Sequence, residues 1–130
     1  MKPLLMIIDD EDMIRKSLTV YFEDVGWEVV SFRTSEEALA YLSSGKPDYA
    51  IVDLRLPGIT GLEFIRKCKK ILPLITCVIY TGSIENGTAE DLMELGLRED
   101  QIILKPAASL GILRDALTGS NEPPRRNREC

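Results

Sequence analysis

Four short segments of the chain are apolar at almost every position, rather than at every second position. They are residues 4–8, 49–52, 76–80 and 101–104. Continuous apolar runs of this length are typical of parallel strands that are buried on both faces of a sheet. A fifth segment, residues 28–32, mixes polar with apolar residues, which favours an edge strand. The pattern therefore predicts five strands, four of them buried.

The segments between these strands carry apolar residues three or four positions apart, which is the spacing of an amphipathic helix. Thr34 and Glu37 have the spacing of a capping box at the start of the second helix. The fourth helix is expected to begin near Thr88, and Gly111 weakens the fifth. The residues expected to face the core are Ile14, Leu18, Phe22 and Val25, then Ala38, Leu39 and Leu42, then Leu62, Ile65, Cys68 and Leu72, then Leu92, Met93 and Leu95, and finally Leu110, Leu113 and Leu117.

Strand and helix thus alternate five times, and parallel strands require a crossover connection of this kind. The predicted fold class is α/β, a doubly wound (βα)5 sandwich of three layers with a parallel five-stranded sheet. Periodicity alone does not fix the order of the strands. In such sheets ligands and reactive groups collect at the carboxyl ends of the strands, so these ends are where chemistry is expected.

Length and composition favour a single domain in a chain of 130 residues. We expect it to cover residues 1–118, because residues 119–130 lack apolar periodicity and are rich in turn formers, as in a flexible tail or a truncated linker. The apolar runs are too short to span a bilayer, and no secretory cleavage site follows the first of them. A cytoplasmic location without membrane contact is the expectation.

Charge and residue types exclude several kinds of chemistry. The net charge of −5 disfavours direct binding of nucleic acid by this domain. The chain contains no histidine, which excludes Ser-His-Asp and Cys-His mechanisms and the usual histidine zinc sites. Three cysteines make an odd count without a CxxC pair, so we interpret Cys68 and Cys77 as reduced core residues. Any reaction must use carboxylates, lysine and hydroxyl groups.

Polar residues follow four of the predicted strands, at the edge where chemistry is expected. The first strand is followed by Asp9 and Asp10, the third by Asp53, the fourth ends at Thr81, and the fifth is followed by Lys105. Each one alone has a plain explanation as a helix cap, a turn residue or a surface charge. Four such strand ends on one edge favour a common site.

Electrostatics indicates what such a site would need. Two like charges about 4 Å apart cost roughly 4 kcal/mol at an effective dielectric constant of about 20, so clustered carboxylates require a cation. Mg²⁺ prefers a few carboxylates, a carbonyl and water, and it leaves positions open for phosphate oxygens. Asp53 is the nucleophile candidate because it stands alone at its strand end, and Asp9 and Asp10 would hold the metal. With Thr81 and Lys105, these are the groups that phosphoryl transfer to a carboxylate requires.

These motifs resemble those of a known family. Residues 3–118 resemble the receiver domain of two-component response regulators. The segments that carry the resemblance are Ile7-Ile8-Asp9-Asp10-Glu11, Asp53-Leu54-Arg55-Leu56-Pro57-Gly58 with Gly61, Thr81-Gly82, and Lys105-Pro106. The resemblance implies a flavodoxin-like sheet with strand order 2-1-3-4-5 and a cis bond between Lys105 and Pro106.

The resemblance also implies roles for the site residues. Asp53 would receive a phosphoryl group from a phosphohistidine on a sensor histidine kinase or a histidine phosphotransfer protein. Thr81 and Lys105 would contact the phosphoryl oxygens, with Thr81 shifting toward them as the switch. The ligands of Mg²⁺ would be Asp9, Asp10, Asp53 and the backbone carbonyl of Arg55.

The chain departs from the family pattern in the switch region. Family members commonly carry Tyr or Phe three residues before the matching lysine, where this chain has Ile102, which is stiff and lacks a hydroxyl. Tyr80 precedes Thr81, but alternation along the strand should direct it to the opposite face. Arg55 lies two residues after Asp53, where the resemblance suggests control of attacking water, and we hypothesise that it slows hydrolysis of the acyl phosphate.

Alternative functions remain on the same architecture. An aspartyl phosphatase would carry a second acid two residues after the nucleophile, where this chain has Arg55, and a flavodoxin-like cofactor binder would not place four acids in its first loop. The expected function is a phosphoacceptor switch rather than a turnover enzyme. A stand-alone shuttle is slightly favoured over the input domain of a larger, for example DNA-binding, regulator, and a degenerate receiver acting by protein contacts alone is the weaker alternative. The downstream target is unknown, and a homodimer formed on phosphorylation is left open.

Overall fold

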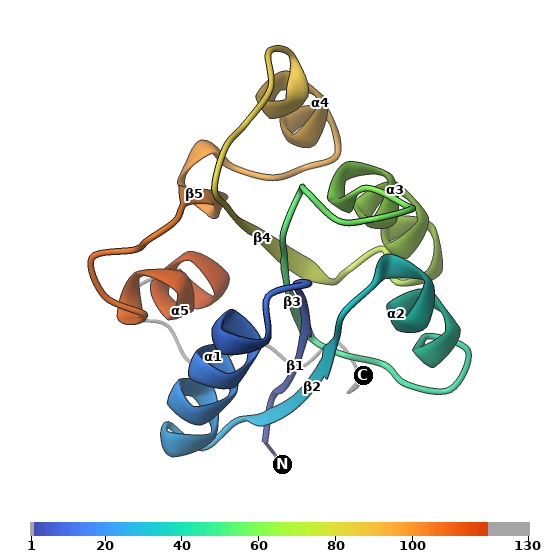
Figure 1. Cartoon of the computed structure of the whole chain (residues 1–130). Coiled ribbons are helices and arrows are strands. Elements are labelled where there is room, and N and C mark those ends of the chain that lie inside the picture. The colour runs from blue at the N-terminus through green and yellow to red at the C-terminus, as the bar shows by residue number, and fades with distance from the viewer. Residues whose placement is uncertain (1, 120–130) are drawn as a thin grey trace.

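A parallel sheet of five strands forms the centre of the molecule, and helices pack on both of its faces (Figure 1). The computed structural model describes residues 2–119, so the predicted tail at 119–130 lies, apart from Gly119, outside the described residues. The elements are β1 (Leu4–Ile8), α1 (Asp12–Asp24), β2 (Glu28–Phe32), α2 (Ser35–Tyr41), β3 (Tyr49–Val52), α3 (Gly61–Ile71), β4 (Thr76–Thr81), α4 (Thr88–Glu94), a short 3-10 helix η1 (Glu99–Gln101), β5 (Ile102–Leu104) and α5 (Gly111–Thr118).

The order of the strands is β2-β1-β3-β4-β5, and every neighbouring pair is parallel. The predicted fold class and the strand order implied by the family resemblance are therefore confirmed. The register places Ile8 of β1 opposite Val52 of β3, so these two strands end side by side. The N–H of Asp53 continues the pairing by donating to the Ile8 carbonyl at 3.0 Å. This register brings the residues that follow β1 and β3 to one place.

Two apolar cores lie on the two faces of the sheet, because neighbouring strand residues point to opposite sides. Met6, Ala50 and Ile79 face the core under α2, α3 and α4. Ile7 and Ile51 belong to the other core, which α1 and α5 cover. Cys68 and Cys77 are both buried in the first core, as the sequence predicts. Burial raises the pKa of Cys68 to about 12 and that of Cys77 to about 11, which is the behaviour of inert core thiols.

Some sequence predictions are wrong at the edges of the fold. β5 was expected to be buried on both faces, but it is the second edge strand, and Leu104 is 54% exposed. Val25 lies just after α1 rather than within it and is exposed, as is Met93 on α4. Apolar character predicts burial only where an element has neighbours on both sides, and periodicity does not report how many neighbours a strand has.

The start of α2 follows the capping prediction in part. The Thr34 hydroxyl accepts the N–H of Glu37 at 3.1 Å, which satisfies one of the free donors of the first turn. The Glu37 carboxylate pairs with the Thr34 hydroxyl at 3.2 Å, where a full capping box would have it accept the Thr34 N–H. Within residues 2–119, no helix is both long and apolar enough to span a membrane.

Candidate functional site

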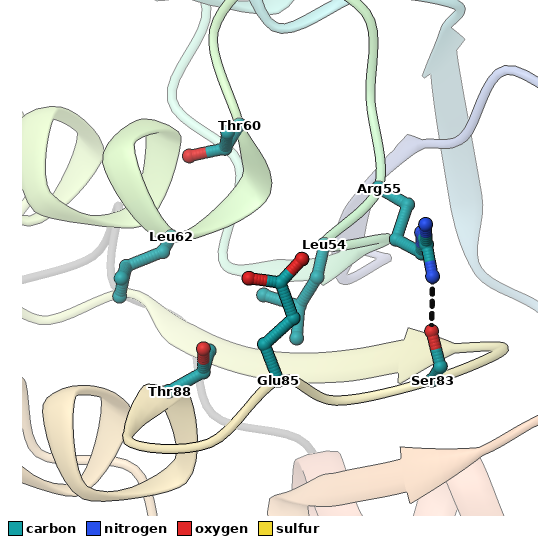
Figure 2. A pocket seen from close by; sticks show the side chains of 7 residues that line it. All are labelled: Leu54, Arg55, Thr60, Leu62, Ser83, Glu85 and Thr88. Atoms are coloured by element: carbon teal, nitrogen blue, oxygen red, sulfur yellow. Dashed lines mark hydrogen bonds between the residues drawn. The ribbon is translucent and has the colours of Figure 1, made fainter.

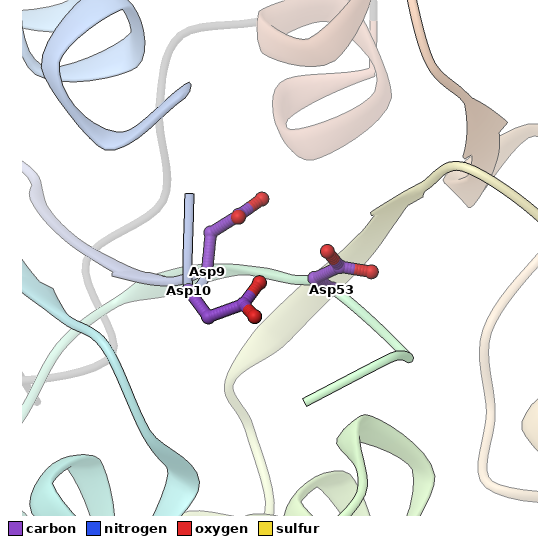
Figure 3. A group of neighbouring side chains, drawn as sticks. All are labelled: Asp9, Asp10 and Asp53. Carbon is purple, nitrogen blue, oxygen red and sulfur yellow. The ribbon is translucent and has the colours of Figure 1, made fainter. Parts of the chain in front are cut away.

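The carboxyl edge of the sheet brings together every side chain that the sequence nominated for a site. Figure 3 shows Asp9, Asp10 and Asp53 at the neighbouring ends of β1 and β3. One carboxylate oxygen from each lies within 4.8 Å of the others. Asp9 and Asp53 are buried, at 2% and 5% exposure, whereas Asp10 is exposed. The group therefore combines two buried acids with one that faces solvent.

Asp53 is held by contacts to its backbone and its side chain. Its Oδ1 accepts the backbone N–H of Arg55 at 3.1 Å, which turns the chain immediately after the strand. Gly61, at the start of α3, packs directly against this turn: a Cβ atom at Gly61 would lie 2.2 Å from the Asp53 carbonyl oxygen. The N–H of Gly61 donates to the Leu54 carbonyl at 3.1 Å. The first turn of α3 therefore packs against the backbone at Asp53 and Leu54 and restricts its position.

Thr81 ends β4 and is fully buried beside Asp53. Its Oγ1 lies 2.7 Å from Asp53 Oδ1 and donates to it, although the two residues are 28 positions apart in the chain. The hydroxyl also lies 3.3 Å from the Ser83 carbonyl. The Thr81 side chain thus already faces the carboxylate that the sequence singled out.

Lys105 provides the positive charge of the site. Its ammonium lies 2.8 Å from Asp9 Oδ2, 2.6 Å from Glu11 Oε2 and 3.0 Å from Asp53 Oδ2. Burial lowers the pKa of Lys105, but the hydrogen bonds that its ammonium donates to the three carboxylates outweigh this and raise the pKa above its ordinary value. The ammonium is therefore charged throughout the physiological range.

One lysine does not balance the acids around it. Asp9, Asp10, Glu11 and Asp53 carry four negative charges against the single charge of Lys105, which leaves a formal charge of −3 when all four acids are ionised. Burial raises the pKa of Asp9, although the Lys105 ammonium and the Glu11 N–H act in the opposite direction. The site therefore has a surplus of negative charge that favours binding of a cation.

The loop after β4 contacts the loop after β3 beside the site. Arg55 reaches across from the β3–α3 loop, and its Nη1 donates to Ser83 Oγ at 2.5 Å (Figure 2). The two loops border a pocket of about 190 Å³, which Thr60 and Leu62 line on the α3 side and Glu85 and Thr88 on the α4 side. The side chain of Arg55 thus lines this pocket, while its backbone N–H contacts Asp53.

Three contacts in this region were not predicted. Glu11 was noted only as part of an acidic run, yet it pairs with Lys105. Ser83 bonds to Arg55, and the Tyr80 hydroxyl accepts the N–H of Ala107. Each pair is separated by at least 27 positions in the chain, so local patterns carry no signal for it. The predicted cis bond between Lys105 and Pro106 is present.

Comparison with known proteins identifies the family. Residues 5–117 match the model of the response regulator receiver domain. The phosphate regulon transcriptional regulatory protein PhoB of Pseudomonas aeruginosa is 30% identical over 129 residues, which are 92% of this chain and 56% of that protein. The chain belongs to the response regulator receiver domain family, and it spans about half the length of this curated relative.

Solved structures agree with this assignment. A CheY-like receiver domain protein from Methanospirillum hungatei superimposes with a TM-score of 0.81 at 25% identity, and the match covers 88% of this chain and 90% of that one. A response regulator from Burkholderia pseudomallei, described with a phosphorylated aspartic acid, a calcium ion and citrate, gives a TM-score of 0.81 at 26% identity over 90% of this chain and 67% of that one. The chain is thus a signalling domain of two-component systems.

Proposed function

We propose that Asp53 is the phosphoacceptor of this receiver domain and that it receives the phosphoryl group from a phosphohistidine in the presence of Mg²⁺. The observation that carries the proposal is the set of contacts around the Asp53 carboxylate. It accepts from the Thr81 hydroxyl at 2.7 Å and from the Arg55 N–H at 3.1 Å, and it pairs with Lys105 at 3.0 Å. Asp9 and Asp10 are close to it, but only Asp53 has all three contacts.

The donor groups suit a hard divalent cation. Mg²⁺ favours oxygen ligands from one or two carboxylates together with water, and the three aspartates supply carboxylate oxygens within 4.8 Å of one another. Asp9, Asp10 and Asp53 would hold the ion together with the backbone carbonyl of Arg55. When bound, Mg²⁺ would offset the surplus negative charge of the site and that of the incoming phosphoryl oxygens.

The transfer itself moves one phosphoryl group between two atoms. A carboxylate oxygen of Asp53 attacks phosphorus, the N–P bond of the phosphohistidine breaks, and its electron pair stays on the imidazole of the donor. Lys105 and Thr81 lie where they can exchange their contacts with the carboxylate for contacts with phosphoryl oxygens. This exchange is the event that would signal to a target.

The domain and its partners follow from the same proposal. We assign the receiver to residues 1–118 and treat residues 119–130 as a tail or linker. The donor would be a sensor histidine kinase or a histidine phosphotransfer protein. Because the chain spans about half of PhoB, the input domain of a larger regulator fits as well as a stand-alone shuttle.

Intact-mass spectrometry after incubation with phosphoramidate and Mg²⁺ tests the proposal. The wild-type protein should gain one phosphoryl group, and Asp53→Ala should gain none. Asp24→Asn is the matched control, because Asp24 is an exposed acid at the far end of α1 and should leave the gain intact. No gain in the wild type would contradict the proposal and favour a degenerate receiver that acts by protein contacts alone.

A further inference from the structure

Tyr80 occupies the strand position directly before Thr81 and is buried, with 4% of its surface exposed. Its ring belongs to the core between the sheet, α1 and α5, whereas Ile79 belongs to the core on the opposite face. The Tyr80 side chain therefore lies on the face of the sheet opposite to that of Ile79. It nevertheless reaches the site by another route.

That route is the loop between β5 and α5. The Tyr80 hydroxyl accepts the N–H of Ala107 at 3.0 Å, and Ala107 lies two residues after Lys105. The N–H of Lys105 itself donates to the Thr81 carbonyl at 2.8 Å. The segment 105–107 is therefore attached to β4 at both of its ends, through two consecutive residues of that strand.

The aromatic ring makes a second contact with the same segment. Lys105 Nζ lies 5.8 Å from the centroid of the Tyr80 ring, which is within the range of a cation–π interaction. The Lys105 side chain is only 12% exposed, so this attraction is less weakened by water than it would be at the surface. Tyr80 thus contacts the backbone beside Lys105 through its hydroxyl and the ammonium through its ring.

We propose that Tyr80 is a positioning residue that holds Lys105 in place for phosphoryl transfer to Asp53. The proposal rests on the proposed function of Asp53. Without the Tyr80 hydroxyl, the segment 105–107 would be attached to β4 at the Thr81 end alone. The ammonium would then spend less time at the distance of 3.0 Å from Asp53 that the structure records.

The variant Tyr80→Phe removes the hydroxyl and keeps the ring. We expect its rate of phosphorylation by phosphoramidate to fall roughly three- to tenfold, the factor that corresponds to the net worth of one hydrogen bond. Tyr80→Leu removes the ring as well and should reduce the rate further. Mg²⁺ affinity should not fall in Tyr80→Phe, because the carboxylate ligands follow β1 and β3, and a looser Lys105 competes less for Asp9 and Asp53.

Tyr21→Phe is the matched control. Tyr21 is partly buried and packs against the same core, beside Phe22, and its hydroxyl makes no hydrogen bond within residues 2–119. Removing that hydroxyl should leave the phosphorylation rate at the wild-type value. A fall in rate confined to Tyr80→Phe therefore reports the contact with Ala107 rather than loss of any tyrosine hydroxyl beside this core.

Nuclear magnetic resonance of the unphosphorylated protein supplies a readout that does not depend on transfer. In Tyr80→Phe the Ala107 amide should exchange its hydrogen roughly three- to tenfold faster, again the factor for one hydrogen bond. The ¹⁵N signal of the Lys105 ammonium should shift or broaden. Both signals should match the wild type in Tyr21→Phe.

The proposal requires a slower rate and an altered Lys105 signal together with an Mg²⁺ affinity that does not fall. A wild-type rate or a wild-type Lys105 signal in Tyr80→Phe overturns it. So does a parallel loss of rate, Mg²⁺ affinity and melting temperature, which would show a purely structural role. If the wild-type protein takes up no phosphoryl group, the proposed function fails, and the Lys105 signal alone then decides whether Tyr80 positions this lysine.

Discussion

Gly61 offers the most exacting test of how the fold supports the site. A Cβ atom at this position would lie 2.2 Å from the Asp53 carbonyl oxygen and 2.8 Å from the Leu54 Cα. Ordinary van der Waals contact begins at 3.4 Å, so Gly61→Ala requires the backbone of Asp53 or the start of α3 to move by about 1.2 Å, the difference between 3.4 and 2.2 Å. The obstructing atoms are backbone atoms, so no side-chain rotation can relieve the clash.

The displacement should affect both stability and phosphorylation. Overpacking of this kind typically costs about 1–3 kcal/mol, which corresponds to a fall in Tm of roughly 4–12 °C for a domain of this size. A misplacement of about 1 Å in a reacting group can reduce a rate roughly 100-fold. We therefore expect Gly61→Ala to melt earlier in calorimetry and to accept phosphate from phosphoramidate about 100 times more slowly than the wild type.

Gly82→Ala is the control for this prediction. Gly82 lies directly after Thr81, but a Cβ atom there would meet nothing within 4 Å, and its backbone is outside the left-handed region. Its Tm and its phosphorylation rate should stay close to those of the wild type. A Gly61→Ala protein that melts and is phosphorylated like the wild type would refute the inference that α3 fixes the position of Asp53.

Three further predictions concern Arg55 and the buried thiols. The Arg55 side chain, which bonds to Ser83, is expected to limit the access of water to the acyl phosphate. Arg55→Ala should therefore lose its phosphoryl group several-fold faster than the wild type. An unchanged or slower loss, followed by intact mass, would contradict this role. In a Cys130→Ser background, Cys68 and Cys77 should react with a thiol reagent at pH 8 only after the protein is unfolded. Both thiols are buried, and their pKa values are raised to about 12 and about 11. The folded protein holds the two thiol protons more tightly than the unfolded chain, so the free energy of unfolding should fall as the pH rises from 9 through 11. Denaturant titration measures this free energy, and a constant value over that range would contradict the prediction.

The positions of the reactive side chains were predictable because the chain places them directly after buried strands. The apolar run before Asp9 and the run before Asp53 each predict a strand, and parallel strands end at the same edge of a sheet. Parallel topology places both aspartates at one edge of the sheet. That β1 and β3 are neighbours, and that Thr81 and Lys105 reach Asp53, depends in addition on the order of the strands, and that order came from the family resemblance rather than from periodicity.

The contacts around the site could not be read from the sequence. The bond from Tyr80 to Ala107 and the pair of Lys105 with Glu11 depend on loop geometry and on side-chain conformation. Exposure of Leu104 likewise depends on the absence of a strand beyond β5 in the described part of the chain, because its apolar character resembles that of a buried residue. Hydrophobic patterns predict the type of an element and not which elements pack beside it.

The central claim, that Asp53 carries the phosphoryl group, is tested most directly by locating that group. Borohydride reduction of the phosphorylated protein converts an aspartyl phosphate to homoserine, which peptide mass mapping identifies by position. We predict homoserine at position 53 and unmodified aspartate at Asp9 and Asp10. Homoserine at Asp9 or Asp10 instead, with aspartate retained at position 53, would contradict the account.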